Sequence, residues 1–416
     1  MKRRLTFSRL NIWLAVLAAL ILAGLVAAGF VYARGLVITN LTDLVPWGLW
    51  ITIDLSSIAL GAGAFLLSAA VYILDLKHLK HVARTAVFVG LIGYTMALFT
   101  LLLDIGRPER FWHALLYWNP HSLLWEIAMC VTLYLGVLSM ELLPILGEAD
   151  FMRKRWPRLA SFLRSVHRIA PVLAVVGLML SLLHQSSLGA AFGVVKARPI
   201  WFRPGLSLLY ILSAMAGGPA LTILASMIAS RLSPRAIVDE EVLNRLSKVV
   251  GWVLVGYFYF RFWDALSMTY TGLPGRNEGF YLLTQGSFAL NFWVGEILLG
   301  ILVPIVILLN NRLRSNQLLR MVALALVAIG LVYYRWDTTV VGQTVLVSYL
   351  PQDTLARFTQ YTPSLAEIAT SLGIVAYGLF AFTLGVQHLR IVDHREAEPV
   401  EAEEAPKLQA QPSEAS

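Results

Sequence analysis

Charged residues are scarce in this chain. Only 14% of its 416 residues are Asp, Glu, Lys or Arg, whereas 58% are hydrophobic, and the mean hydropathy is +0.69. Soluble domains carry roughly 25% charged residues, so this composition excludes a soluble globular protein and indicates an integral membrane protein. The net charge of +8 does not indicate nucleic-acid binding, because the basic residues stand in short loops between apolar runs.

Cysteine is almost absent. The single cysteine, Cys130, lies within an apolar segment, which excludes an internal disulfide and any cysteine-ligated iron–sulfur cluster or zinc site. Of the 8 histidines, only His184 lies clearly within an apolar run, with His121 as the one plausible partner for a bis-histidine haem. We therefore expect no metal or cofactor bound by this chain. Any electrons must then pass between an external donor and a bound small molecule.

Apolar runs long enough to cross the ~30 Å hydrocarbon core of a bilayer recur along the chain. We predict ten transmembrane helices, at 10–31, 47–74, 85–103, 123–146, 169–188, 206–229, 249–270, 288–309, 318–334 and 365–389. The expected fold class is an all-α polytopic membrane protein with two four-helix bundles plus flanking helices. Small residues at 61–63 and 217–218 recur in the second and sixth helices, as in a parallel duplication. The alternative is that they only allow close helix packing.

Lysine and arginine are unevenly distributed between the loops. Most of the 33 basic residues stand in the terminal segments and in alternate loops, above all in the loop at 153–168. The positive-inside rule therefore places both termini in the cytoplasm of a cell inner (plasma) membrane. The first apolar run resembles a signal peptide but is too long and lacks a clear cleavage site, so we expect a retained helix. We predict a transmembrane domain over 1–392 and an acidic, disordered cytoplasmic tail over 393–416.

Ionisable residues inside the predicted helices gather at one depth. In this topology the periplasmic half of the membrane contains Asp54, Glu126, His184, Arg261, Asp264 and Glu296. A charge inside a helix costs about 2.5–3.5 kcal/mol on insertion scales, so several at one depth must pair or line a wet cavity. Arg261 and Asp264 are spaced to share a helix face. Glu141 is the exception, since it lies in the cytoplasmic half.

Each of these residues also has a structural interpretation. His184 could be a core histidine bonded to a backbone carbonyl, and Arg261 with Asp264 could be a structural ion pair inside the membrane. Asp54, Glu126 and Glu296 lie close enough to helix ends for snorkelling or helix-dipole effects to explain them. Depth alone does not distinguish these alternatives from a binding pocket.

Four segments resemble the NrfD/PsrC superfamily of membrane subunits, and within it most nearly the HybB-type subunit of membrane-bound uptake hydrogenase. They are VPWGLWI at 45–51 with Asp54, DIGRPERF at 104–111, LWE at 124–126 with MELLP at 140–144, and HQSSLG at 184–189. The resemblance implies a ten-helix quinone-reactive subunit without a bound cofactor. It implies docking to a periplasmic ferredoxin-like subunit with [4Fe–4S] clusters and to a catalytic subunit, and electron exchange with menaquinone or ubiquinone near the outer face.

Residues and resemblance together predict the membrane subunit of an anaerobic respiratory oxidoreductase with a hydrogenase-like or molybdoenzyme-like partner. The iron–sulfur subunit would rest on the outer loops 104–120, 190–205 and 335–363. The candidate catalytic residues are Glu126, His184, Arg261 and Asp264, and the candidate quinone-binding residues are Trp50, Asp54, Gln185 and Glu296. His184 would donate a hydrogen bond and relay a proton to a quinone carbonyl. Asp264 and Glu126 would exchange protons, with Arg261 holding Asp264 ionised. Two alternatives stay open: a passive membrane anchor, and a proton-translocating subunit with a path through Glu141.

Overall fold

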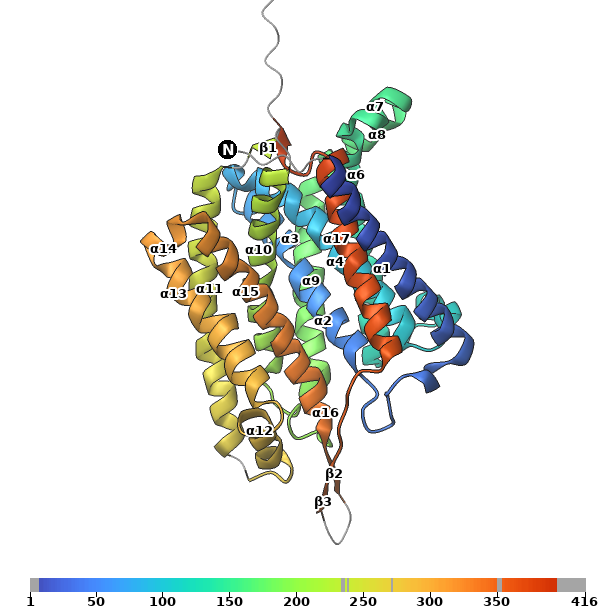
Figure 1. Ribbon diagram of the computed structural model, residues 1–416, viewed down its shortest axis with the longest axis vertical. Helices are drawn as coiled ribbons and strands as arrows, with labels where there is room; N and C mark the ends of the chain where they lie inside the picture. The colour runs from blue at the N-terminus through green and yellow to red at the C-terminus, as the bar shows by residue number, and fades with distance from the viewer. Residues whose placement is uncertain (1–6, 233–235, 238, 271, 350–353, 395–416) are drawn as a thin grey trace, which may run out of the picture.

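The computed structural model describes residues 7–394, except 233–235, 238, 271 and 350–353. Each predicted apolar run is helical in this part of the chain, although the run 47–74 is divided into two helices at residue 62. Nine helices among the described residues are long and apolar enough to cross a membrane. The remaining run, 249–270, belongs to α11 (Glu240–Tyr270), whose 31 residues also extend along the bundle (Figure 1). Arg261 and Asp264 make α11 less apolar than its neighbours. The prediction of an all-α, multi-pass membrane protein is confirmed.

Long helices form the body of the molecule. They are α1 (Phe7–Arg34), α2 (Leu49–Gly61), α3 (Gly63–Tyr72), α4 (Lys80–Asp104), α6 (Leu123–Glu148), α9 (Ala170–Gly193), α10 (Leu206–Leu232), α11, the π-helix η5 (Asn291–Leu302) continued by α13 (Val303–Leu309), α15 (Gln317–Trp336) continued by the π-helix η6 (Asp337–Val341), and α17 (Leu365–His388). Short helices connect them: η1 (Leu36–Ile38), η2 (Lys77–Leu79), η3 (Pro108–Arg110), α5 (His113–Leu116), α7 (Asp150–Arg155), α8 (Pro157–Ser165), η4 (Val166–Ile169), α12 (Arg276–Thr284), α14 (Asn311–Ser315) and α16 (Gly342–Thr344).

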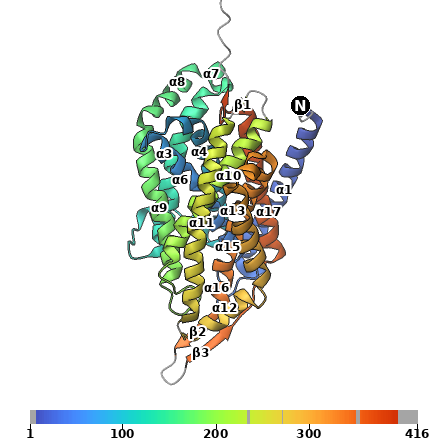
Figure 2. The same cartoon turned by 90° about the vertical axis from the view of Figure 1, so that its left-hand side faces the viewer.

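The long helices pack as two four-helix bundles. The first contains α2 with α3, α4, α6 and α9, and the second contains α10, α11, η5 with α13, and α15. Helices α1 and α17 pair with each other (Figure 2), and α17 packs on α4 at the side of the first bundle. This arrangement confirms the expected two bundles with flanking helices.

The bundles meet where two glycines touch. A Cβ atom added to Gly63 would lie 2.3 Å from the carbonyl carbon of Gly218, which is closer than any real contact. The small residues at 61–63 and 217–218 therefore let α3 and α10 cross in backbone contact, which is the packing role considered above.

Gly63→Ala should lower the thermal stability of the detergent-solubilised protein. The added methyl group must push two backbones apart, and overpacking typically costs about 1–3 kcal/mol. Gly136→Ala is the matched control, because a Cβ there meets nothing within 4 Å. We expect the control to melt at or above the wild-type temperature, since alanine favours the helix. A Gly63→Ala protein with the same melting temperature as the Gly136→Ala control would contradict this account of the interface.

The two ends of the molecule are distinct. Strands β2 (Val345–Tyr349) and β3 (Thr354–Phe358) form an antiparallel hairpin that projects beyond the helices (Figure 1). The start of α1 and the short pair β1 (Ala236–Ile237) with β4 (Asp393–His394) lie at the opposite end. We call these the hairpin end and the terminal end. Of the predicted tail, Asp393 and His394 form β4, and residues 395–416 lie outside the described residues.

Connections at the hairpin end are held by buried hydrogen bonds. Arg198 donates to the carbonyl oxygens of Gln343 (2.5 Å) and Leu44 (2.6 Å), and burial lowers the pKa of its guanidinium. The Gln343 side chain in turn bonds both the N–H (3.2 Å) and the carbonyl oxygen (2.5 Å) of Trp47. These bonds fix the start of α2, which carries Trp50 and Asp54, relative to the end of α15.

Candidate functional site

Two arginines and two carboxylates lie buried together in the second bundle, toward the hairpin end. Arg261 Nη1 lies 3.0 Å from Asp264 Oδ2 on the same helix, as the spacing predicts. Arg261 also donates from Nε to Glu296 Oε1 (2.6 Å) and from Nη2 to Oε2 (3.2 Å). Arg203, in the connection before α10, forms a second ion pair with Asp264. We call Arg203, Arg261, Asp264 and Glu296 the ion-pair cluster.

The π-helix η5 presents Glu296 to this cluster. Glycines lie on either side of it in sequence, and a Cβ at Gly300 would lie 2.6 Å from Gly330 Cα of α15. Close contact with α15 and the wider turn of a π-helix place Glu296 in the interior, opposite Arg261. π-Helical turns are frequently found at functional sites.

A second cluster joins the two bundles. His184 of α9 is fully buried, and its Nδ1 shares a hydrogen bond of 3.3 Å with the hydroxyl of Tyr94 from α4. The adjacent Gln185 accepts a hydrogen bond of 3.3 Å from Arg335 Nη2 of α15. Arg335 also donates to Ser213 Oγ (3.1 Å) and lies over the ring of Tyr210. We call Tyr94, His184, Gln185 and Arg335 the His184 cluster.

Tyr334 connects the two clusters. The guanidinium carbon of Arg335 lies 5.3 Å from the centre of its ring, and that of Arg261 lies 5.5 Å away. Tyr257 is a further neighbour, because its hydroxyl lies 3.5 Å from Glu296 Oε1 and its ring packs on Tyr334. The predicted convergence of ionisable groups from separate helices is therefore present, as two adjoining clusters.

The clusters differ in how fully their polar atoms are satisfied. Both carboxylates of the ion-pair cluster have arginine partners. In the His184 cluster, four buried atoms have no hydrogen-bond partner: His184 Nε2, Gln185 Nε2, Arg335 Nε and Arg335 Nη1. Arg335 has no carboxylate at ion-pair distance within the part of the chain that is described. An unpartnered buried polar atom costs about 1–3 kcal/mol, so these atoms are suited to bind water or a ligand.

The other predicted site residues lie apart from these clusters. Trp50 is buried and donates from Nε1 to Thr370 Oγ1 of α17 (2.8 Å). Asp54 follows it on α2, buried, with Oδ1 unpartnered. Glu126 is half-buried in the first turn of α6, and its carboxylate makes no hydrogen bond or ion pair with any described residue. The structure therefore brings together His184, Gln185, Arg261, Asp264 and Glu296, but not Trp50, Asp54 or Glu126.

Sequence reasoning did not select several residues of the clusters. Arg335 ends an apolar run and carried the same signal as Arg261, namely a charge at membrane depth. Arg203 lies in a loop, where an arginine is ordinary. Nothing in the sequence marks Tyr94 and Tyr334 as site residues, because tyrosine is common in apolar helices. Their neighbours are known only once the helices are packed together.

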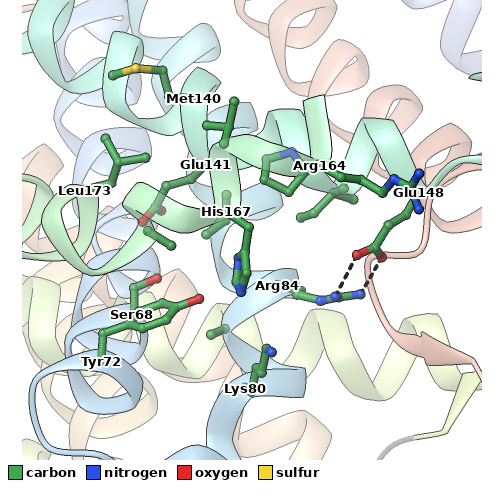
Figure 3. A pocket seen from close by; sticks show the side chains of 16 residues that line it. Ser68, Tyr72, Lys80, Arg84, Met140, Glu141, Glu148, Arg164, His167 and Leu173 are labelled. Atoms are coloured by element: carbon green, nitrogen blue, oxygen red, sulfur yellow. Dashed lines mark hydrogen bonds and ion pairs between the residues drawn. The ribbon is translucent and has the colours of Figure 1, made fainter. Parts of the chain in front are cut away.

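The first bundle opens into a cavity at the terminal end. The cavity measures about 240 Å³, and its polar lining includes Tyr72, Lys80, Arg84, Glu141, Arg164 and His167 (Figure 3). Arg84 forms a two-bond ion pair with Glu148 (2.9 and 3.1 Å). Glu141 has one oxygen without a hydrogen-bond partner, and its carboxylate extends on the side of the cavity where Ser68 and Tyr72 lie (Figure 3). We call this cavity the vestibule.

Comparison with known proteins gives a consistent set of matches. Residues 37–347 match the family described as "Polysulphide reductase, NrfD". The integral membrane subunit of menaquinone reductase from Nitratidesulfovibrio vulgaris is 34% identical over 396 residues, 93% of each chain. A subunit of selenate reductase from Mesobacillus selenatarsenatis is 25% identical, over 91% of this chain and 93% of its own. The probable Ni/Fe-hydrogenase 2 b-type cytochrome subunit of Escherichia coli is 26% identical, over 85% and 86%.

The name of the Escherichia coli relative refers to a b-type cytochrome, but the described residues of this chain do not provide a bis-histidine haem site. A bis-histidine haem needs two facing imidazoles within the bundle. Among the histidines whose burial the structure describes, only His184 is buried, and its Nδ1 is bonded to Tyr94. His121, the one candidate partner, is exposed in a loop at the hairpin end.

Proposed function

Because the chain belongs to the polysulphide reductase NrfD family, we propose that it is the quinone-reactive membrane subunit of a multisubunit respiratory oxidoreductase. Relatives along nearly its whole length are named as subunits of menaquinone reductase, selenate reductase and a hydrogenase. The positive-inside rule places the hairpin end in the periplasm and the terminal end in the cytoplasm of the inner membrane. Electrons pass between an iron–sulfur subunit at the hairpin end and menaquinone or ubiquinone in the bilayer.

The His184 cluster is the observation that carries this proposal. Quinone reduction consumes two electrons and two protons, so it needs donors that stabilise a developing oxyanion and a group that delivers protons. Arg335 supplies a buried cation with unpartnered N–H groups and no carboxylate partner among described residues. His184 supplies a second unpartnered ring nitrogen, and Tyr94 on its other side completes a relay.

The ion-pair cluster has a different role in this proposal. Asp264 is held between two arginines, and Glu296 accepts two hydrogen bonds from Arg261. We assign the cluster to holding α10, α11 and η5 together, which is the structural alternative for Arg261 and Asp264. Glu126, half-buried at the hairpin end, remains a candidate for proton exchange with the periplasm.

The partner subunits dock at the hairpin end in this proposal. The hairpin β2–β3 extends furthest beyond the helices, within the predicted docking segment 335–363 (Figure 1). The segment 104–120 presents exposed aromatic side chains, including Trp112, Tyr117 and Trp118. A ferredoxin-like iron–sulfur subunit resting there would lie on the same side of the membrane as the His184 cluster, which keeps the electron-transfer distance short.

The test uses the purified complex in sealed vesicles with added quinone. We expect electron transfer between the partner subunits and the quinone, and quinone extracted with the complex. A passive anchor would give neither: substitutions in the His184 cluster would then alter assembly of the complex but leave its rate unchanged.

Proton translocation is a second candidate function, and the vestibule favours it. Glu141 lies at its inner wall and is seven residues, or two helical turns, from Tyr134 on the same face of α6. The ring of Tyr134 packs on Tyr94, the partner of His184. This polar column would connect the cytoplasm with the quinone site. In the same vesicles, Glu141→Gln should abolish the proton movement that exceeds the two protons consumed per quinone reduced and leave quinone turnover, whereas the exposed Asp150→Asn changes neither. Equal proton movement in Glu141→Gln and wild type would exclude this path.

A further inference from the structure

An apolar groove runs along the membrane face between the two bundles. It measures about 220 Å³ and is bounded by α2, α4, α10 and α17. Its walls are aliphatic, aromatic or glycine except for Ser57 and Met96, and glycines at 61, 93 and 378 leave it hollow. Inside a bilayer such a groove is filled by hydrocarbon, because water gains nothing from apolar walls.

The hairpin end of this groove carries unsatisfied polar atoms. Asp54 precedes Ser57 by three residues on α2, and Ser371 precedes the lining residue Val375 by four on α17, so each stacks one turn above the groove wall. Both are buried, at 4% and 5% exposure, and Asp54 Oδ1 and Ser371 Oγ have no hydrogen-bond partner. Asp104 Oδ1 at the end of α4 is a third unpartnered atom. A ligand that suits this place has a long apolar tail and a compact polar head.

We propose that the groove holds the isoprenoid tail of the quinone and that the ring first binds beside Asp54 and Ser371, an entry position distinct from the reduction position at the His184 cluster. This inference rests on the proposed function and adds the place in the membrane where the tail of the substrate lies. A quinol hydroxyl can donate to the Asp54 carboxylate, and a quinone carbonyl can accept from the Ser371 hydroxyl. A phospholipid suits the site poorly, because its phosphate would meet the carboxyl groups of Asp54 and Asp104.

The position also connects the ring to the His184 cluster. Tyr94 follows the lining residue Gly93 on α4, and its ring lies against Gly61, since a Cβ added there would be 3.2 Å from Tyr94 Cδ2. The hydroxyl of the same tyrosine bonds His184. Tyr94 therefore stands between the groove wall at Gly61 and the histidine.

A bulky side chain in the groove should weaken binding of the quinone tail without changing the chemistry at the quinone ring. Ala225→Phe on α10 places a phenyl ring among the lining residues, and Val176→Phe on the exposed face of α9 is the matched control. In the complex, we expect Ala225→Phe to raise KM at least about tenfold for a long-tailed quinone and to leave KM for a tail-less quinone unchanged. The control should change neither value. Equal KM values in Ala225→Phe and wild type for the long-tailed quinone would overturn the proposal.

A labelling measurement decides the case even if Ala225→Phe does not assemble. Ser57→Cys, combined with Cys130→Ala, is treated with a membrane-permeant maleimide in quinone-depleted membranes. We expect long-tailed quinone to slow the reaction and tail-less quinone not to. Protection by added phospholipid but not by quinone would overturn the proposal in favour of a phospholipid acyl chain. Absence of protection by either lipid would also overturn it. Absence of quinone turnover in the wild-type complex would instead defeat the proposed function, while labelling still reports on the groove.

Discussion

Replacing Arg261 with leucine is expected to destabilise the protein by about 3–5 kcal/mol, because removing one partner of a buried ion pair leaves its counter-charges uncompensated. Glu296 would lose both of its charge-assisted hydrogen bonds in a site that is 1% exposed, whereas Asp264 would keep Arg203. The measurement is thermal unfolding of the detergent-solubilised protein, together with its yield in membranes.

Two further variants show whether the charge or the side-chain volume is responsible. Arg245→Leu on the same helix breaks an ion pair whose members are 72% and 69% exposed, and such pairs contribute at most about 1 kcal/mol. Adding Glu296→Gln to Arg261→Leu removes the stranded charge and should recover part of the lost stability. If Arg261→Leu and Arg245→Leu have the same melting temperature, the ion-pair cluster does not stabilise the bundle. If the double variant is less stable than the single one, stranded charge is not the cause.

Much of the fold could be predicted from the sequence because membrane helices leave a simple signal. Runs of about 20 apolar residues mark the spans, since each backbone polar group in the bilayer must bond within its own helix. Two features left no such signal. The π-helix η5 depends on contact between Gly300 and Gly330 from another helix, and the break between α2 and α3 stands in an unbroken apolar run. Both arise from helix packing, which a local pattern does not encode.

The sequence predicted the depth of the candidate site residues in the membrane, but not which other residues their side chains contact. Arg261 with Asp264 was identified because both lie on one helix, three residues apart. The contacts of Arg335 with Gln185 and of Tyr94 with His184 join residues 150 and 90 positions apart, so they depend on which helices become neighbours. Position along the chain fixes the depth of a side chain, whereas the neighbours of its helix face depend on the arrangement of the other helices. Glu126 illustrates the difference: it lies toward the same end as the clusters, but no described partner faces it.

His184→Ala should lower quinone-dependent turnover by about 100- to 1000-fold, the usual contribution of a positioned proton-transfer group. The complex should still assemble, because the ion-pair cluster and the glycine contacts between the bundles do not involve His184. The measurement is the steady-state rate with saturating quinone, set against the amount of complex recovered by affinity purification.

Tyr94→Phe and Ser186→Ala show whether the relay or only the local packing matters. Tyr94→Phe keeps the ring contacts with Tyr134 and removes the hydroxyl that bonds His184, so it should slow turnover by about tenfold or more without loss of assembly. Ser186 lies two residues further along α9 and bonds only the carbonyl oxygen of Leu183, so Ser186→Ala should turn over at the wild-type rate. Normal quinol formation by His184→Ala would remove the histidine from the mechanism. A slow Tyr94→Phe beside a normal His184→Ala would instead place proton delivery on the groove side of Tyr94, because the tyrosine contacts both the groove wall and the histidine.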